Sequence, residues 1–235
     1  MIETLFSSFR FDPARAAALQ EELARRVVRR DRIGKVRWIG GVDVDIVGGR
    51  GRAAVVVLEA GTLELLEART AEREVRVPYI PGFLAFREVP VILAAFKKLR
   101  RRPDLLIVDG MGLIHPRRLG LACHLGLALG LPSIGCGKTP FVGEWDAPAP
   151  DRGAWSPVID AGERVGAVLR TRAGVKPVFV SIGHRVSLRT AVSWVLRTAT
   201  EARLPRPIRL AHQAASFAHH SVRMNRKMQD TAESR

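Results

Sequence analysis

The chain has 235 residues and no linker that would divide it, a length that suits one large α/β domain. We expect this domain to cover residues 1–222 and a disordered tail to cover residues 223–235, where no apolar pattern continues. Lys and Arg number 38 against 23 Asp and Glu, and the net charge of +15 favours a polyanionic partner such as nucleic acid. The opening residues lack the apolar core of a secretory signal, and no run of about 18 apolar residues occurs. These features argue against membrane partners, and we expect a soluble cytoplasmic monomer.

The first third of the chain predicts one helix and three strands. Residues 13–30 place apolar side chains at helical spacing with arginines opposite them, which is typical of a surface helix. Two β-branched runs, residues 36–45 and 52–59, are separated by glycines and predict an antiparallel hairpin. A third strand is expected over residues 63–75.

Residues 104–129 predict a strand, a tight turn and a helix. Residues 104–109 are four apolar side chains bracketed by acids, which suits a strand buried on both faces of a parallel sheet. Gly110 and Gly112 end this strand, and apolar residues recur at helical spacing from about residue 117. Asp109 is therefore expected at the carboxyl end of a strand, where open α/β sheets bind ligands.

The predicted order of elements is that of the ribonuclease-H-like fold, an α/β fold with a mixed central sheet flanked by helices. In that fold the first strand lies beside the fourth, so Asp43 is expected beside Asp109. Two carboxylates on neighbouring strands can share a hard divalent cation. Asp45 has the same orientation as Asp43 and is a reserve ligand.

Residues 77–88 predict a rigid loop before a helix. Pro78, Pro81 and Gly82 hold Tyr79 out on the loop, where its ring can stack on bases or wedge between them. Pro90 is tolerated only in the first turn of a helix or at a kink. Glu88 is therefore expected near the N-terminal end of the next helix, where it can turn toward the aspartates.

The second half of the chain continues the α/β pattern. A short buried strand over residues 131–138 ends in Lys138, alternating strands follow over 156–171, and another strand covers 176–182. Ser187 is expected to cap a helix. A final helix over residues 208–220 carries three histidines, of which the two at its end are expected on the surface.

Five motifs of the chain are long and specific: GGVDVD (40–45), PYIPGFLAFRE (78–88), DGMGLIHPRRLGLACHLG (109–126), KPVFVSIGH (176–184) and IRLAHQ (208–213). In these motifs the chain closely resembles the endonuclease V family of deoxyinosine-directed nucleases, and the match covers nearly everything except the tail. The resemblance implies a Mg²⁺-dependent endonuclease, with Mn²⁺ as a substitute. Such an enzyme cuts DNA at the second phosphodiester bond 3′ to a deaminated base and leaves a 3′-hydroxyl and a 5′-phosphate.

The resemblance also assigns roles to individual residues. Asp43 and Asp109 match the metal-binding aspartates, and Glu88 matches the third acidic catalytic residue, which we also expect to bind the metal. Lys138 matches a lysine near the cut phosphate, and His212 a histidine near the metal centre. Tyr79 matches the wedge residue, and further DNA contacts are expected from Pro78, Ile80, Pro81 and His115. We expect the extruded base in a pocket lined by the backbone of Gly82, Leu84, Gly110, Gly112 and Gly135.

Two positions depart from the family pattern. Met111 stands where a histidine is usual, which removes a polar contact near the metal. Thr139 and Pro140 stand where a basic residue usually follows the lysine, which weakens the assignment of Lys138. Two alternatives stay open: a ribonuclease-H-like nuclease acting on inosine-containing RNA or branched DNA, and a lesion-binding module without catalysis.

Overall fold

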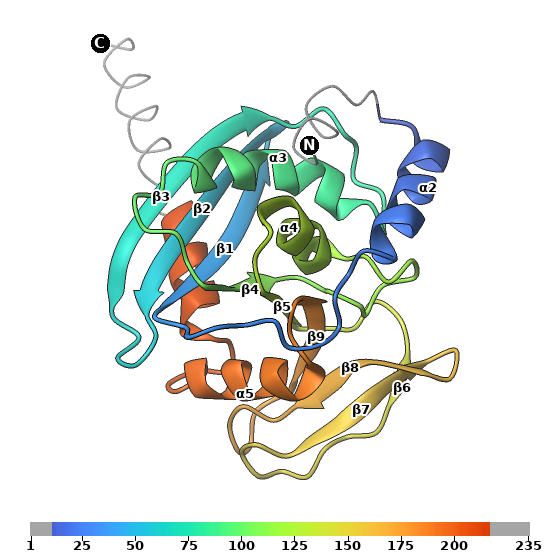
Figure 1. Ribbon diagram of the computed structural model, residues 1–235, viewed down its shortest axis with the longest axis vertical. Helices are drawn as coiled ribbons and strands as arrows, with labels where there is room; N and C mark the ends of the chain where they lie inside the picture. Colours follow the sequence, from blue (N-terminus) through green and yellow to red (C-terminus); the bar gives the residue numbers. More distant parts are fainter. Residues whose placement is uncertain (1–10, 217–235) are drawn as a thin grey trace, which may run out of the picture.

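The computed structural model describes residues 11–216, which form a mixed sheet with helices on both faces (Figure 1). In this part of the chain the sheet has nine strands in the order β3-β2-β1-β4-β5-β9-β8-β7-β6. The strands are β1 (Trp38–Val47), β2 (Arg50–Glu59), β3 (Leu65–Glu74), β4 (Leu105–Asp109), β5 (Ser133–Gly137), β6 (Glu144–Trp145), β7 (Trp155–Asp160), β8 (Glu163–Leu169) and β9 (Val178–His184). The helices are α2 (Pro13–Ala24), α3 (Leu84–Phe96), α4 (Leu121–Leu129) and α5 (Leu188–Thr198), and residues 206–216 form a last one, helix 206–216.

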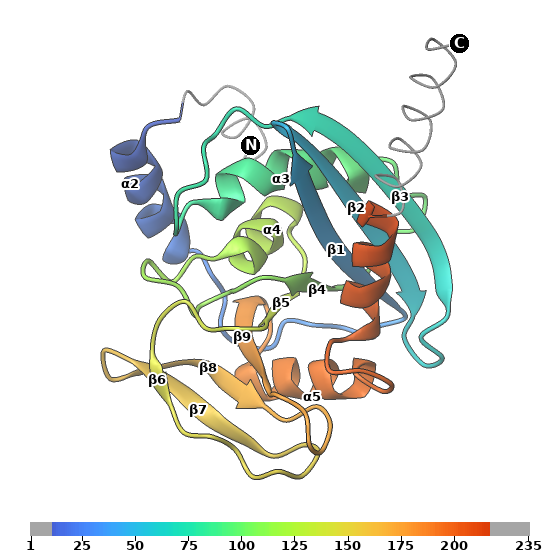
Figure 2. The same ribbon diagram turned by 180° about the vertical axis from the view of Figure 1, so that it is seen from behind.

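The strand pairing confirms the expected ribonuclease-H-like fold. Strands β1, β2 and β3 form an antiparallel meander, and β4 pairs in parallel with both β1 and β5. Helices α3 and α4 lie in front of the sheet in Figure 1, and helix 206–216 comes in front of it in the view from behind (Figure 2). The register aligns Val42 of β1 with Val108 of β4, so the next residue of each strand is an aspartate.

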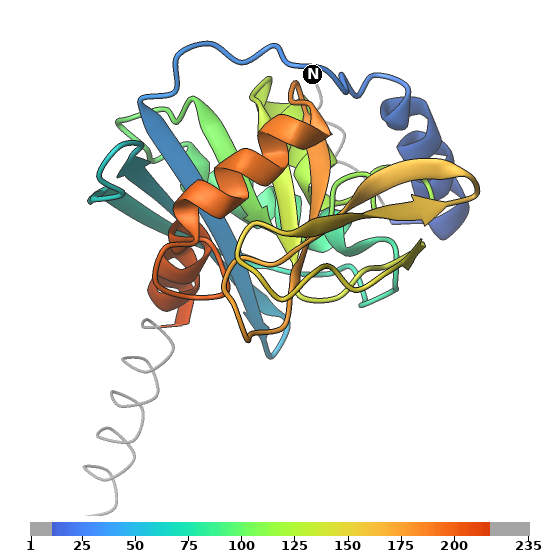
Figure 3. The same ribbon diagram turned by 90° about the horizontal axis from the view of Figure 1, so that it is seen from below.

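The central strand β4 is buried on both faces, as its apolar run predicts. Leu106 and Val108 of β4 pack in the core beneath α3 and α4. Leu105 and Ile107 face the opposite core, which α5 and helix 206–216 cover (Figure 3). All four side chains are fully buried. A strand buried in this way holds its carboxyl-terminal aspartate in a fixed place.

The first helix ends at Ala24, so the expectation of a helix through residue 30 is wrong. Val28 and the segment around it run past the end of β9 instead. The Val28 N–H donates to Nδ1 of His184, and the Val28 carbonyl accepts from the N–H of Arg185. The β-branched pair of Val27 and Val28 favours this extended path, and Val27 is buried by it.

Two further helix boundaries differ from expectation. Helix α3 begins at Leu84, and Pro90 lies inside it. Ala85 and Phe86, which precede Pro90, are also buried, so the apolar face of the helix extends toward its N-terminus. The free energy gained by burying them exceeds the cost of a proline inside the helix. Helix α4 begins at residue 121 rather than 117, because Arg118 adopts a left-handed conformation (φ 54°) that no helix accommodates.

The end of the chain is only partly described. Helix 206–216 is the described part of the expected final helix, and the two histidines at its expected end lie outside the described residues. The same holds for the expected tail over residues 223–235. Among residues 11–216, no helix is both long and apolar enough to cross a membrane.

Candidate active site

Three carboxylates meet where the central strands end. Asp43 and Asp109 come from the parallel neighbours β1 and β4, and Glu88 projects from α3, which packs over β1, β2 and β3. All three side chains are largely but not fully buried, and Asp43 and Asp109 keep exposed fractions of 16% and 21%. The structure thus brings together three acids that lie about 20 to 65 residues apart in the sequence.

The carboxylates repel one another. Burial, followed by the charges of Asp43 and Asp109, raises the pKa of Glu88 to about 8. Burial also raises the pKa of Asp109, an effect that Lys138 opposes and Asp43 reinforces. A buried cluster of like charges is stable only when protons or a cation neutralise it.

Two basic side chains flank the acids. The ammonium of Lys138, just after β5, lies 3.6 Å from Oδ2 of Asp109. Nδ1 of His212 lies 2.9 Å from Oδ2 of Asp43. Both basic side chains are more than half exposed, so they border the site on the solvent side.

A glycine explains how His212 reaches β1. Helix 206–216 begins directly against the strand at Gly41, where an added Cβ would lie 2.2 Å from the backbone oxygen of Pro207. Only a residue without a side chain permits this approach. The Gly-Gly pair before Asp43 therefore sets the distance between the strand and the helix that carries the histidine.

The donor set fits a hard divalent cation. Carboxylate oxygens are the ligands that Mg²⁺ prefers, and burial together with the charges of Asp43 and Asp109 raises the pKa of Glu88, an effect that a bound cation would oppose. Within residues 11–216, no three His, Cys, Asp or Glu side chains form a ready-made metal cage. The fit therefore rests on ligand chemistry and charge.

A cavity of about 360 Å³ opens beside the acids. Asp109 and Lys138 form part of its wall. The wall also includes residues of the proline loop (residues 78–82), of the start of α3 and of the turn after β4: Tyr79, Pro81, Gly82, Leu84, Gly110 and Met111. Sequence reasoning missed Gln20 and Phe141, which also line it and lie outside the motifs that it singled out.

Gly112 and Gly135 lie behind the cavity wall. A Cβ on Gly112 would lie 1.9 Å from the oxygen of Ile182, and one on Gly135 would lie 2.5 Å from the nitrogen of Gly112. These two glycines let the turn after β4 pack tightly on β5 and β9. Both were expected to line the pocket, but neither is among the residues that line this cavity.

The proline loop presents Tyr79 to solvent. Its side chain is 68% exposed, and the guanidinium of Arg87 lies 5.7 Å from the centre of its ring. Pro78 and Pro81 are exposed beside it. Ile80, in contrast, is half-buried and packs against a small apolar cluster that includes Phe83.

His115 is buried at the cavity rather than exposed. Its ring stacks on Phe141, with 5.6 Å between ring centres, and burial lowers its pKa to about 4. Its Nδ1 accepts from the N–H of Arg117, so the neutral ring carries its proton on Nε2. The structure gives His115 a place in the cavity wall.

The fold and the acids at its strand ends define the class of protein as a nuclease of ribonuclease-H-like fold. The sequence profile of the family described as Endonuclease V matches residues 21–213. The chain belongs to the endonuclease V family.

Individual relatives agree with this assignment. The chain is 50% identical over 194 residues to an endonuclease V of Dictyoglomus turgidum, which covers 83% of this chain and 85% of the relative. The crystal structure of endonuclease V from Streptomyces avermitilis superposes with a TM-score of 0.87 at 40% identity and covers 92% of this chain and 96% of its own. An endonuclease V of Ciona intestinalis, crystallised with a 24mer DNA containing an inosine followed by a ribo-adenosine, gives a TM-score of 0.78 at 26% identity over 89% and 98% of the two chains.

Proposed function

We propose that this protein recognises deoxyinosine in DNA and hydrolyses the second phosphodiester bond 3′ to it, leaving a 3′-hydroxyl and a 5′-phosphate. The reaction is Mg²⁺-dependent, and Mn²⁺ substitutes. The net charge of +15 and the inosine-containing DNA bound by the Ciona relative support a DNA substrate.

The proposal rests on one observation: the cavity and the acid cluster have two residues in common. Asp109 and Lys138 belong to both, so a base held in the cavity leaves its own strand beside the carboxylates. A cavity of about 360 Å³ is of the size that small planar ligands occupy. Recognition of the base and hydrolysis of its strand would therefore take place at one site.

Each residue of the acid cluster has a role in this proposal. Asp43, Glu88 and Asp109 hold the metal ion, which when bound acts as a Lewis acid on the phosphate and lowers the pKa of a water molecule. Lys138 offsets the negative charge that develops on the phosphate in the transition state. His212 binds Asp43 through Nδ1, so Nε2 is the atom that orients the attacking water.

The proline loop acts on the base. Tyr79 enters the space that the extruded base vacates, and stacking of its ring on the neighbouring bases is worth about 1–3 kcal/mol. Extrusion is least unfavourable for a mispaired base such as hypoxanthine. The cavity then holds the base against the backbone of Gly82, Leu84 and Gly110.

Nick mapping on a labelled duplex with one deoxyinosine tests the proposal. In Mg²⁺ we expect a nick directly after the 3′ neighbour of the lesion, at the second phosphodiester bond, with none in EDTA and none on the undamaged duplex. A gel shift specific to deoxyinosine without any nick would instead support the lesion-binding module. Three acids converging on one site argue against that module, because a binder gains nothing from negative charge beside phosphate.

Inosine-containing RNA is a second candidate substrate. The DNA bound by the Ciona relative carries a ribonucleotide after the inosine. Contacts to phosphates and to a flipped base do not in themselves reject a 2′-hydroxyl. Cleavage rates on matched DNA and RNA oligonucleotides with one inosine each decide between the two substrates.

A further inference from the structure

One backbone carbonyl at the rim of the cavity accepts three hydrogen bonds. The oxygen of Gly82 lies 3.0 Å from Nε2 of Gln20, 3.1 Å from Nε2 of His115 and 2.9 Å from Nη2 of Arg117. A carbonyl oxygen has two lone pairs, so its acceptor capacity is fully used. Gly82 itself adopts a left-handed conformation (φ +84°), which directs its carbonyl toward these donors.

Gln20 is the centre of this arrangement. It comes from α2, is 1% exposed, and lines the cavity. Its Oε1 accepts from Nε of Arg117 at 2.6 Å, which fixes the amide orientation because a guanidinium only donates. Its Nε2 reaches the carbonyl of Leu119 at 3.4 Å as well as that of Gly82. Gln20 therefore links α2 to two other segments, the proline loop at Gly82 and residues 117–119, through one amide group.

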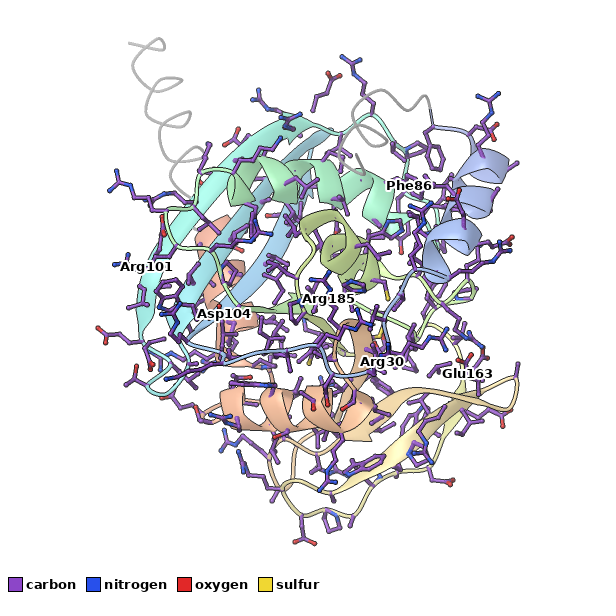
Figure 4. All side chains as sticks on the ribbon, viewed as in Figure 1. Arg30, Phe86, Arg101, Asp104, Glu163 and Arg185 are labelled. Atoms are coloured by element: carbon purple, nitrogen blue, oxygen red, sulfur yellow. The ribbon has the colours of Figure 1, made fainter. Side chains whose placement is uncertain are left out.

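The tied segment is the one that carries Tyr79. Gly82 ends the proline loop, and the guanidinium of Arg117 lies 4.4 Å from the centre of the Phe83 ring that follows. Phe83 and Phe86 pack against Phe11 just before α2, with ring centres 5.8 Å from it. Figure 4 labels Phe86, which lies on the side of α3 that is toward α2. Helix α2 thus braces the proline loop with apolar contacts on one side and with Gln20 on the other.

We propose that Gln20 is a positioning residue for lesion recognition, which holds the Gly82 carbonyl and so keeps the Tyr79 loop and the cavity wall in place before DNA binds. The inference rests on the proposed function. A wall that is already ordered loses less conformational entropy when the base enters, and this difference favours the lesion over an undamaged base. The role gives the N-terminal helix, which lies outside the sheet, a part in substrate selection.

Two substitutions at Gln20 test the role. Gln20→Glu keeps the shape and the acceptor for Arg117 but loses the donor to Gly82, and Gln20→Met removes both without burying a charge. The matched control is Glu22→Gln on the same helix, which removes only an exposed ion pair with Arg26. Thermal melting establishes that each variant is folded at the assay temperature.

The readout is the ratio of the dissociation constants for undamaged and deoxyinosine duplexes, measured in Ca²⁺ to prevent cleavage. We expect both Gln20 variants to lower this ratio about tenfold by weakening deoxyinosine binding, with the constant for undamaged DNA unchanged within about twofold. The unchanged activity is expected only of the control: Glu22→Gln, whose side chain is exposed and outside the cavity lining, keeps the wild-type nicking rate in Mg²⁺. Glu22→Gln keeps the wild-type ratio.

Other outcomes overturn the inference. An unchanged ratio in both Gln20 variants, or equal weakening of both duplexes, would show that Gln20 serves only the fold. A wild-type protein without preference for deoxyinosine would overturn the proposed function together with the inference. Wild-type preference that survives both Gln20 substitutions overturns the inference alone.

Discussion

Glu88 is the most strongly perturbed acid of the site. It is buried beside two other carboxylates, and its pKa of about 8 records both burial and repulsion. The same repulsion that raises this pKa creates the demand for a cation. A residue that strains the metal-free protein in this way is expected to be essential for the reaction and dispensable for the fold.

Replacing Glu88 with glutamine separates these two properties. Glu88→Gln removes the buried acid without changing its shape, so we expect a higher melting temperature than wild type in EDTA. In Mg²⁺ we expect single-turnover nicking of deoxyinosine DNA to fall about a hundredfold or more. Wild-type nicking by this variant would remove Glu88 from the metal site.

Gly137 and Met111 both line the cavity and lie against each other there. A Cβ on Gly137 would lie 2.1 Å from the terminal methyl of Met111, which is the mobile end of a flexible side chain. Gly137→Ala should therefore displace that methyl into the cavity rather than disturb the backbone. We expect deoxyinosine binding in Ca²⁺ to weaken about tenfold, with little change in melting temperature.

The double variant provides the control. Gly137→Ala with Met111→Ala removes the displaced methyl, and we expect it to restore deoxyinosine binding toward the wild-type value. Additive losses in the double variant would show that Met111 does not fill the cavity. A restored affinity would make residue 111 a determinant of cavity size in this chain.

The elements of the fold were predictable where local chemistry decides them. The buried run of β4 and the Ser187 cap of α5, whose side chain accepts from the Thr190 N–H, both agree with expectation. The starts of α3 and α4 were not predictable, because tertiary packing places Pro90 inside a helix and Arg118 in a left-handed turn. Local propensity is a weak guide where burial on the sheet competes with it.

The hydrogen bond between His184 at the end of β9 and Val28 after α2 makes the free energy of unfolding depend on pH. His184 accepts a hydrogen bond from the N–H of Val28 at 3.2 Å, and burial, with Arg185, lowers its pKa from 6.5 to about 4. Below pH 6.5 the unfolded chain takes up a proton that the folded chain does not, so the free energy of unfolding decreases until about pH 4.

His184→Asn tests this dependence. The side-chain oxygen of asparagine can accept from Val28 but does not titrate, so we expect a smaller loss of stability between pH 6.5 and about 4. Chemical denaturation at several pH values in EDTA measures it. His115 and His124, whose pKa values burial lowers to about 4 and about 3, leave a remaining loss. An unaltered pH profile would contradict the assignment.

At the scale of the whole molecule, the charge of +15 predicts how DNA binding responds to salt. We expect log K for undamaged DNA to fall with log salt by about 0.9 for each phosphate that the protein neutralises. The ratio between deoxyinosine and undamaged duplexes should stay constant, since base contacts supply it. Binding isotherms at several salt concentrations measure both. A ratio that collapses with salt would place lesion selectivity in the phosphate contacts.

The whole-molecule arrangement also marks the limit of sequence reasoning. Acids at the ends of neighbouring strands follow from strand order, so the adjacency of Asp43 and Asp109 was predictable from the pattern of elements along the chain. Gln20 meets Gly82 and Arg117 across separations of 62 and 97 residues, and no local pattern signals that meeting. The cavity is assembled from such contacts, so its full lining emerges only in three dimensions.

In the proposed function, base reading and strand cutting are adjacent but separate functions of one site. Binding of deoxyinosine and undamaged duplexes in Ca²⁺ by Asp109→Ala and Tyr79→Ala, measured side by side, tests this separation. We expect Asp109→Ala to bind the deoxyinosine duplex selectively, although it does not nick it in Mg²⁺, whereas Tyr79→Ala loses about tenfold in selectivity. Equal losses of selective binding in the two variants would show that the two functions are not separate.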